Sequence, residues 1–213
     1  MTDHTSQTKG NNFSINKHSL QVVFGIPGVI FYDSVIDDDS ILLSARLKAK
    51  TAKCSCCGKR SKSIHSSYMR KLTDLAAAGK SVKIILKVRK FRCRNTHCAQ
   101  TVFSEQHPRL TQRYSRLTSR ATDYLQQLLI EVSSRKGEYL SSLLLIKRSS
   151  STCLRIVKSI EIPNYKELTT IGIDDWAYRK GKSYGTIIVN AINNRPIDLI
   201  KSRDKEEVAS WLK

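Results

Sequence analysis

The chain has 213 residues, enough for one large domain or for two to three small ones. It contains 37 Lys and Arg residues against 18 Asp and Glu residues, a formal net charge of +19, which indicates a polyanionic partner and says nothing about the fold. The N-terminal sequence lacks the apolar core of a signal peptide, and no apolar run reaches the length of a membrane span, so we expect a cytoplasmic protein.

The first half of the chain predicts a polar tail followed by strands. Residues 1–19 are polar and predict a loose tail, and residues 20–31 form a short apolar element that is broken by Gly and Pro. Apolar residues alternate with Ser, Arg and Lys over residues 43–50, which predicts a half-buried strand with a basic outer face. Residues 81–92 show a similar mixture and predict a second strand.

The positive charge is concentrated in one segment. Residues 46–116 hold nineteen basic and only two acidic side chains. A basic run is most often a solvated surface, but a block of this length with so few acids favours contact with nucleic acid. The candidate contacts in this segment are Lys83, Lys87, Arg89, Lys90 and Arg92.

Four of the six cysteines form two pairs at the ends of the predicted strands. Cys54 and Cys57 are a C-x2-C pair, and Cys93 and Cys98 are a C-x4-C pair. In the cytoplasm such clusters are typical of metal ligands, and four thiolates suit a closed tetrahedral structural zinc site. In a small and very basic domain, the metal would supply stability that the core cannot.

Other residues leave this assignment open. Cys56 or His97 can replace one of the four ligands, and two sets of unpaired thiols remain the alternative to a metal site. His65 is expected to be a polar surface residue, and Cys153 a buried free thiol on a later helix.

Helical periodicity begins at about Ser115 and predicts three helices up to Pro163. Ser151 or Thr152 is expected to cap the third. A tight polar turn before this last helix is similar to a helix-turn-helix module, in which Arg155 and Lys158 would lie on the outer face of the recognition helix. A plain helical spacer between two domains is the alternative.

Residues 169–200 contain three strand-like runs, and Ser202 is expected to cap a helix that follows them. Asp174 is expected at the end of the first strand, with Asp175 beside it. Carboxylates from several elements can hold the two metal ions of phosphoryl transfer, whereas a lone Asp pair is most often part of a turn or the surface.

Two long segments together resemble one family. The C-x2-C pair followed by HSSYMRKLTDLAAAGKSVKIILKVRKFRCRNTHC and VFSE resembles the zinc-binding domain of ISL3-family bacterial transposases. IGIDDWAYRKGKSYGTIIVNAINNRPIDLIKSRDKEEVASWL resembles the start of their catalytic domain. The resemblance covers about residues 20–213, with the two motifs in the family's order and a helical segment between them.

The resemblance implies an RNase H-like catalytic domain with an Asp-Asp-Glu triad that uses Mg²⁺ or Mn²⁺ to cut element ends and join them to target DNA. By position in the motif, Asp174 is similar to the first catalytic aspartate. The chain departs from the family because it ends in the helix after the third strand, and we expect it to be truncated before the second and third catalytic carboxylates. The acids downstream do not occupy their places, namely Asp198, Asp204, Glu206 and Glu207.

We therefore predict an α+β, multidomain protein with a loose tail (1–19), a zinc-ribbon-like domain (20–108), a helix-turn-helix-like domain (109–163) and an incomplete RNase H-like domain (164–213). The expected function is DNA binding at the terminal inverted repeats of an insertion sequence, with structural Zn²⁺, without catalysis by this chain alone, as a possible homo-oligomer at the bacterial nucleoid. One alternative is a regulatory protein that represses transposition. Another is an unrelated zinc-ribbon protein that binds RNA, which the low aromatic content of 7% disfavours.

Overall fold

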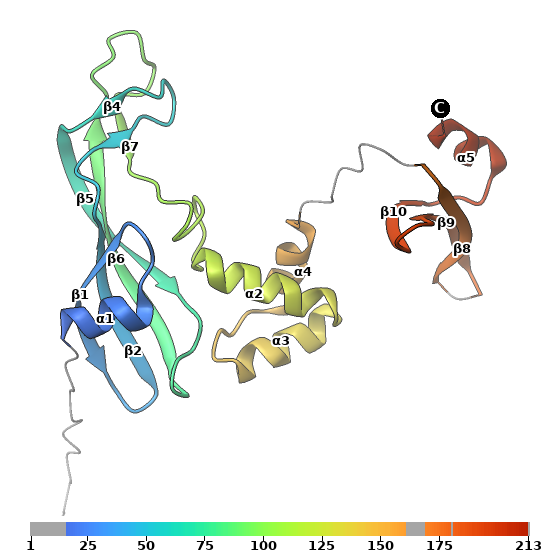
Figure 1. The fold of residues 1–213 in the computed structure, drawn as a ribbon, viewed down its shortest axis with the longest axis horizontal. Helices are drawn as coiled ribbons and strands as arrows, with labels where there is room; N and C mark the ends of the chain where they lie inside the picture. Colours follow the sequence, from blue (N-terminus) through green and yellow to red (C-terminus); the bar gives the residue numbers. More distant parts are fainter. Residues whose placement is uncertain (1–15, 161–168, 180, 213) are drawn as a thin grey trace, which may run out of the picture. The chain divides into compact units, whose positions relative to one another are not determined.

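The computed structural model describes residues 16–160, 169–179 and 181–212 (Figure 1). The chain divides into two compact units, residues 1–160 and 161–213, called here the N-terminal and C-terminal units. The N-terminal unit contains, in chain order, α1 (Lys17–Phe24), β1 (Val29–Ile36), β2 (Ser40–Leu47), β3 (Ala52–Lys53), β4 (Arg60–Ser61), β5 (Ile64–Thr73), β6 (Ser81–Arg92), β7 (Val102–Ser104), α2 (Ser119–Ile130), α3 (Ser134–Leu143) and α4 (Ser150–Lys158). The protein is thus a mixed α+β protein, as predicted.

A five-stranded sheet forms the first part of the N-terminal unit. Its strand order is β1-β2-β6-β5, and the short β7 pairs with the far end of β6. β2 and β6 run parallel, with Leu43 opposite Ile84 and Ala45 opposite Leu86, whereas the other pairs are antiparallel. Because side chains alternate along a strand, these apolar residues share one face, and they form the main core of the unit.

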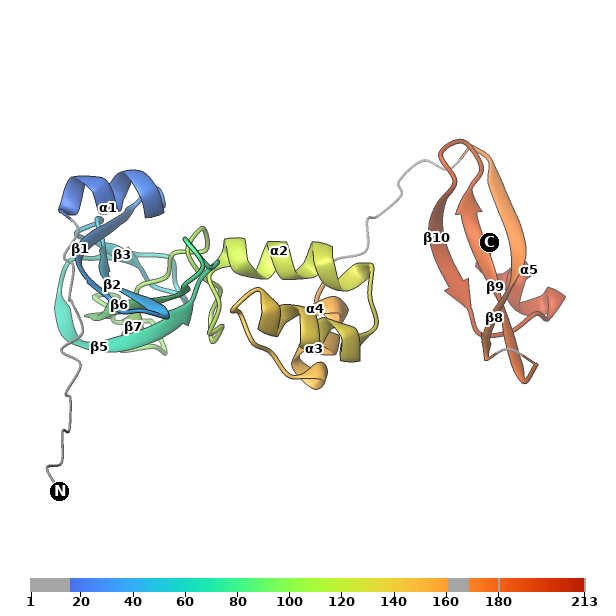
Figure 2. The same ribbon diagram turned by 90° about the horizontal axis from the view of Figure 1, so that it is seen from below.

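Helix α1 covers this apolar face (Figure 2). Asn16 caps the helix, since its side chain accepts the backbone N–H of Ser19 at 2.9 Å. Leu20 and Phe24, four residues apart and therefore on one side of the helix, are buried against the sheet. The opposite face of the sheet thus remains available for basic side chains.

Helices α2, α3 and α4 pack around a second core, which includes Leu125, Leu129 and Cys153. Gly137 lets α3 approach α2 closely, because a Cβ at this position would collide with the side chain of Leu129. The chain enters α2 through Thr118, whose hydroxyl accepts the backbone N–H of Ala121 at 3.2 Å.

A buried carboxylate joins the sheet to α2. Asp74, fully buried just after β5, accepts the Thr118 hydroxyl at 2.6 Å and Nε of Arg120 at 2.8 Å, and forms an ion pair with the same guanidinium. The backbone N–H of Thr118 also donates to the carbonyl of Thr73 at 3.0 Å. The start of α2 is therefore fixed to the end of β5 within the same unit.

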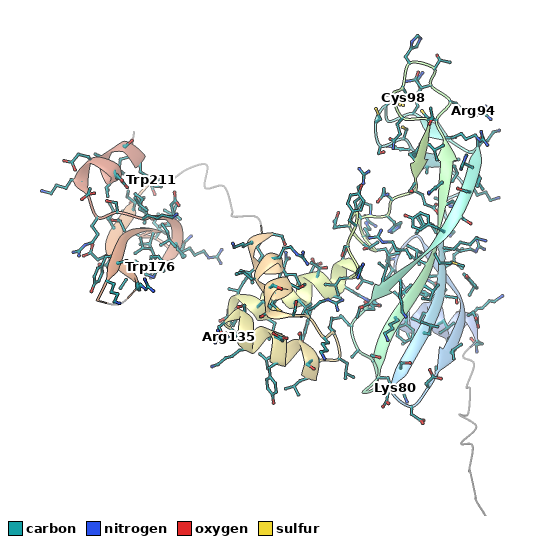
Figure 3. The ribbon with its side chains drawn as sticks, turned by 180° about the vertical axis from the view of Figure 1, so that it is seen from behind. Lys80, Arg94, Cys98, Arg135, Trp176 and Trp211 are labelled. Atoms are coloured by element: carbon teal, nitrogen blue, oxygen red, sulfur yellow. The ribbon has the colours of Figure 1, made fainter. Side chains whose placement is uncertain are left out.

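The C-terminal unit is an antiparallel meander followed by a helix. It contains β8 (Ile171–Arg179), β9 (Ser183–Asn190), β10 (Arg195–Ile200) and α5 (Lys205–Trp211), with strand order β10-β9-β8. Ile188 is fully buried in this unit, and the indole Nε1 of Trp211 donates to Asp198 at 2.7 Å. Figure 3 labels Trp211 and Trp176 in this unit.

The predicted strand over residues 81–92 is confirmed as β6. The strand predicted over 43–50 begins earlier and ends earlier, as β2. Helix α1 begins within the segment predicted to be a loose tail, because Asn16 supplies a cap. Residues 1–15 lie outside the described residues.

Three helix starts differ from expectation. α2 begins four residues after Ser115, at the Thr118 cap. α4 begins at Ser150, before the expected caps, because the carboxylate of Glu138 accepts the Ser150 backbone N–H at 3.0 Å. Before α5, the cap position is Asp204, whose backbone N–H donates to the Ser202 hydroxyl at 2.9 Å. Pro163, expected to end the third helix, lies outside the described residues.

No described helix combines the length and apolar character needed to cross a membrane.

Candidate metal centre and nucleic-acid surface

The first cysteine pair lies on a tight turn between β3 and β4. The backbone N–H of Gly58 donates to the carbonyl of Cys54 at 3.0 Å, and the N–H of Cys54 donates to the carbonyl of Lys59 at 2.9 Å. Gly58 has a φ of +71°, a left-handed conformation that glycine adopts without steric cost. The turn thereby places the Cys54 and Cys57 thiols on the same side.

The second pair lies on the loop between β6 and β7. The N–H of Cys93 donates to the carbonyl of Thr101 at 2.8 Å, and the N–H of Cys98 donates to the carbonyl of Asn95 at 3.1 Å. Figure 3 shows Cys98 and Arg94 at one tip of the sheet, with Lys80 at the other. The long β5–β6 hairpin thus separates the cysteines from the turn between its two strands.

The four thiols converge at this tip. The Sγ atoms of Cys54, Cys57, Cys93 and Cys98 all lie within 4.8 Å of one another. The Sγ atoms of Cys54 and Cys98 are 3.9 Å apart, and those of Cys57 and Cys93 are 3.6 Å apart. Four sulfurs bound at about 2.3 Å to a tetrahedral zinc are about 3.8 Å apart, so the geometry and the all-sulfur donor set fit structural Zn²⁺.

A small aromatic cluster supports the thiols. Phe91 and Phe103 are both buried, with their ring centroids 6.0 Å apart, and they pack with the cysteines. The Ser61 hydroxyl donates to the carbonyl of Arg92 at 2.7 Å, and the N–H of Arg92 donates to the carbonyl of Ser63 at 2.8 Å. These bonds attach the first cysteine turn to the end of β6.

The thiols have unequal acidity in the absence of a cation. The backbone N–H of Lys59 lowers the pKa of Cys57 from 9.0 to about 6. Although the N–H of Gln100 lowers it, burial and neighbouring thiols raise the pKa of Cys98 to about 12. Four thiolates at this spacing therefore need a cation, and a metal ion provides one.

The structure also locates the other candidate ligands. Cys56 is exposed, and neither Cys56 nor His97 belongs to the group of four converging thiols. Cys153 is a buried free thiol in the helical core, as expected, and His65 is exposed on β5. Among the described residues, the four thiols are the one group of three or more His, Cys, Asp or Glu side chains close enough to share a metal ion.

The sheet face opposite α1 is rich in cations. Lys83 and Lys87 of β6 lie on this face, and the strand register places Arg46 of β2 directly beside Lys87. Lys71 of β5 lies opposite Ile85 and points to the same side. We call Arg46, Lys71, Lys83 and Lys87 the basic face. No ion pair links any of its four cations to a carboxylate within the described residues, and Asp33 of β1 lies on the same face.

The remaining predicted contacts on β6 differ from these four cations, because Arg89 lies on the same face but is paired, and Lys90 and Arg92 lie on the other face. Arg89 forms an ion pair with buried Glu105 at 2.6 Å and also donates to the carbonyl of Ala49. Lys90 and Arg92 occupy the alternate face near the cysteine tip, where the Nζ of Lys90 lies 5.5 Å from the ring centroid of Tyr68. Sequence reasoning placed Arg46 on the basic outer face of its predicted strand without naming it as a DNA contact, and it missed Lys71.

The helical part of the N-terminal unit exposes further cations. Arg155 and Lys158 lie on the exposed side of α4, while Cys153 and Ile156 face the helical core. The N-terminus of α4 is occupied by Glu138, as described above. The exposed side chains of α4 are therefore better placed than its backbone for contact with phosphates.

In the C-terminal unit, Asp174 and Asp175 line a pocket beside α5. Asp174 lies within β8 rather than at its end, because the strand continues to Arg179. The carboxylate of Asp175 forms an ion pair with Arg203 at 2.5 Å. Asp198, which also faces α5, accepts the Trp211 indole, so neither of these two acids is a free carboxylate.

Comparison with known proteins shows which proteins this chain is similar to. Residues 50–98, which contain all four converging cysteines, match the zinc finger of transposases IS204/IS1001/IS1096/IS1165, of the ISL3 group. This segment is similar to the zinc finger of the ISL3-type transposases. The chain is similar to the transposase for insertion sequence element IS1001 from Bordetella parapertussis, with 24% identity over 82% of this chain. The chain spans 43% of the length of that relative, and no solved structure matches it.

Proposed function

We propose that this chain is the DNA-binding part of an ISL3-type transposase and that it recognises double-stranded DNA at the terminal inverted repeats of its element. The convergence of four thiols in the segment that matches the transposase zinc finger carries this proposal. A bound Zn²⁺ would be held by Cys54, Cys57, Cys93 and Cys98, and it would supply a rigid tip to the sheet.

The basic face supplies the phosphate contacts in this proposal. Its cations have no carboxylate partner among the described residues, so their charge is available to a polyanion. Phosphate contacts fix the orientation of a protein on DNA but carry no sequence information. Lys90 and Arg92 extend the same electrostatic field around the cysteine tip, whereas Arg89 acts mainly through Glu105.

Sequence readout is assigned to the helical part. Helices α3 and α4 and the turn between them are similar to a helix-turn-helix, with α4 as the recognition helix. Arg155 and Lys158 project from its exposed side, and Arg155 is the longer and more strongly hydrogen-bonding of the two. Its guanidinium is suited to bidentate contact with a guanine edge.

Catalysis is not assigned to the described residues. We propose that the C-terminal unit belongs to an RNase H-like domain, because it is an antiparallel meander with Asp174 on its first strand. Transfer of a phosphoryl group with Mg²⁺ or Mn²⁺ needs several convergent carboxylates. Asp174 has Asp175 beside it, but Asp175 is paired with Arg203.

The first experiment measures zinc and DNA binding together. Protein purified with zinc is titrated into a labelled duplex that carries the element's terminal inverted repeat and into a scrambled duplex of the same length. We expect about one zinc per chain, preference for the repeat, and affinity that falls steeply with salt because counterions are released from DNA. Affinity that is the same at low and high salt would refute the proposal.

A charge variant tests the basic face. In Lys83→Gln/Lys87→Gln, two phosphate contacts are removed, and the slope of log affinity against log salt should fall by about 2. The matched control is Lys182→Gln/Lys205→Gln, which removes two charges from the C-terminal unit. An equal loss in both variants would show a general effect of net charge and not a contact at the basic face.

A further inference from the structure

We propose that residues 109–116, called here the arginine loop, form a second DNA contact in which Tyr114 inserts its ring into a groove and flanking arginines bind phosphates. The inference deepens the proposed function and rests on it, since it names a further surface for the same ligand. The loop is distinct from the basic face, the cysteine tip and α4, and it directly precedes α2.

The loop carries charge without partners. Arg109, Arg113 and Arg116 are all exposed, and the described residues provide no ion pair or side-chain hydrogen bond for any of them. No acidic residue occurs in the sequence between Glu105 and Asp123, and Glu105 itself is buried and forms an ion pair with Arg89. The local field of the loop is therefore strongly positive.

Tyr114 is the most exposed of the large hydrophobic side chains in the described residues, at 84%. Its φ of +62° places a bulky residue in the left-handed region, which such residues rarely adopt. The guanidinium carbon of Arg113 lies 4.9 Å from the centre of its ring. Strained backbone conformations of this kind cluster at functional sites, where the surrounding structure enforces them.

Hydrogen bonds from the side chain of Arg70 hold the backbone around Tyr114. Nη2 of Arg70, on β5, donates to the carbonyl of Gln112 at 2.7 Å and also to the carbonyl of Ser115. The hydroxyl of Thr111 donates to the carbonyl of Leu117 at 2.8 Å. The guanidinium of Arg70 therefore holds the backbone of the loop on both sides of Tyr114.

This arrangement fits duplex DNA. Arginines that flank a protruding hydrophobic side chain are typical of groove binding, in which the cations contact phosphates or the groove floor and the ring packs on sugars and base edges. An exposed ring with Arg113 stacked on it also presents a cation together with a flat apolar surface. Because its order is already enforced by Arg70, the loop loses little conformational entropy on binding.

The test compares tyrosine variants in the whole zinc-loaded chain, with a fluorescein-labelled duplex as the probe. We expect Tyr114→Ala to weaken binding about tenfold while the salt slope stays unchanged, because the ring contributes contact and no charge. Tyr114→Phe should bind as the unaltered protein does. Tyr124→Ala, which removes a 45% exposed tyrosine from α2, is the matched control and should have no effect.

Charge variants provide the second readout. Arg113→Gln and Arg116→Gln should each lower the salt slope by about 1, whereas Arg195→Gln in the C-terminal unit should not. Zinc content and circular dichroism verify that each variant is folded.

The outcomes separate the two proposals. If Tyr114→Ala and Arg113→Gln are folded and bind DNA as the unaltered protein does, the arginine loop is not a DNA contact, although the proposed function stands. If the unaltered protein itself does not bind duplex DNA, the proposed function fails first. Binding of an acidic polypeptide to the loop in preference to DNA would also overturn the inference.

Discussion

The two ends of the N-terminal sheet are stabilised in different ways. Next to α1, the sheet buries a large apolar core that includes Leu43 and Ile84, both fully buried. At the cysteine tip, the buried cluster consists of two phenylalanines and Cys54, with the other thiols packed against it. A small cluster of this kind cannot offset the conformational entropy of two loops, so we expect the tip to depend on a bound metal ion and the rest of the sheet not to.

Loss of one thiolate should have the largest effect, and it should be confined to the tip. In Cys93→Ser, the zinc content should fall from about one per chain toward zero, because an alcohol is a poor zinc ligand; structural zinc contributes about 10 kcal/mol or more to small zinc-dependent folds. Hydrogen exchange should rise over residues 52–61 and 93–101 and remain slow over β2.

The matched control is Cys56→Ser, at the exposed cysteine outside the thiol group. It should keep its zinc and its exchange pattern. Loss of zinc from this variant would mean that Cys56 is a ligand.

A cavity in the apolar core should produce the converse result. Ile84→Ala removes a fully buried side chain and should lower the free energy of unfolding by about 2–5 kcal/mol. The protein that remains folded should retain stoichiometric zinc. Thermal denaturation followed by circular dichroism, together with zinc analysis, measures both quantities, and a coupled loss of zinc at low temperature would contradict the independence of the two ends.

A change at Asp74, which connects β5 to α2, should have a smaller effect on the free energy of unfolding. Asp74→Asn keeps an acceptor for the Thr118 hydroxyl but removes the charge that pairs with Arg120. The loss should be about 2 kcal/mol, since the partner guanidinium is partly exposed and remains hydrated. Faster hydrogen exchange at the start of α2, with zinc content unchanged, is the expected signature, and Asp123→Asn on the same helix is the control.

The smallest effect concerns the attachment of the cysteine turn to β6. Ser61→Ala deletes the bond from its hydroxyl to the carbonyl of Arg92 and should cost about 1 kcal/mol. Zinc should still bind, but its release to a competing chelator should be faster than in the control Ser63→Ala. Equal release rates would show that this hydrogen bond does not restrain the metal site.

Much of this architecture was predictable where periodicity was strong. The alternation in residues 81–92 identified β6 because the strand is central and buried on one face. Strand β5 was not predicted, since six consecutive residues from Ile64 to Met69 are exposed and give no alternation. Its pairing with β6 depends on backbone hydrogen bonds, which leave little trace in the sequence.

The candidate site shows the same division. Cysteine spacing identified two pairs, and the chemistry of zinc explained why four thiols would meet, but only the folded sheet distinguishes Cys56 from the four converging thiols. The pairing of Arg89 with Glu105 was not predictable, because sixteen residues separate them and β7 brings them together. Asp174 was expected at a strand end, but β8 extends beyond the apolar residues that indicated it.

The parallel pairing of β2 with β6 has a consequence for the order of folding. Residues 48–80, which lie between the two strands, include the first cysteine turn and all of β5. β2 and β6 can therefore pair only when this long intervening segment forms a loop, which is a slow, non-local step in folding. The Sγ atoms of Cys57 and Cys93 are 3.6 Å apart, and a zinc ion bound to both would shorten the loop that remains to be closed. Metal supply during synthesis should thus influence how fast the nascent chain escapes aggregation, even though the finished core does not contain the metal.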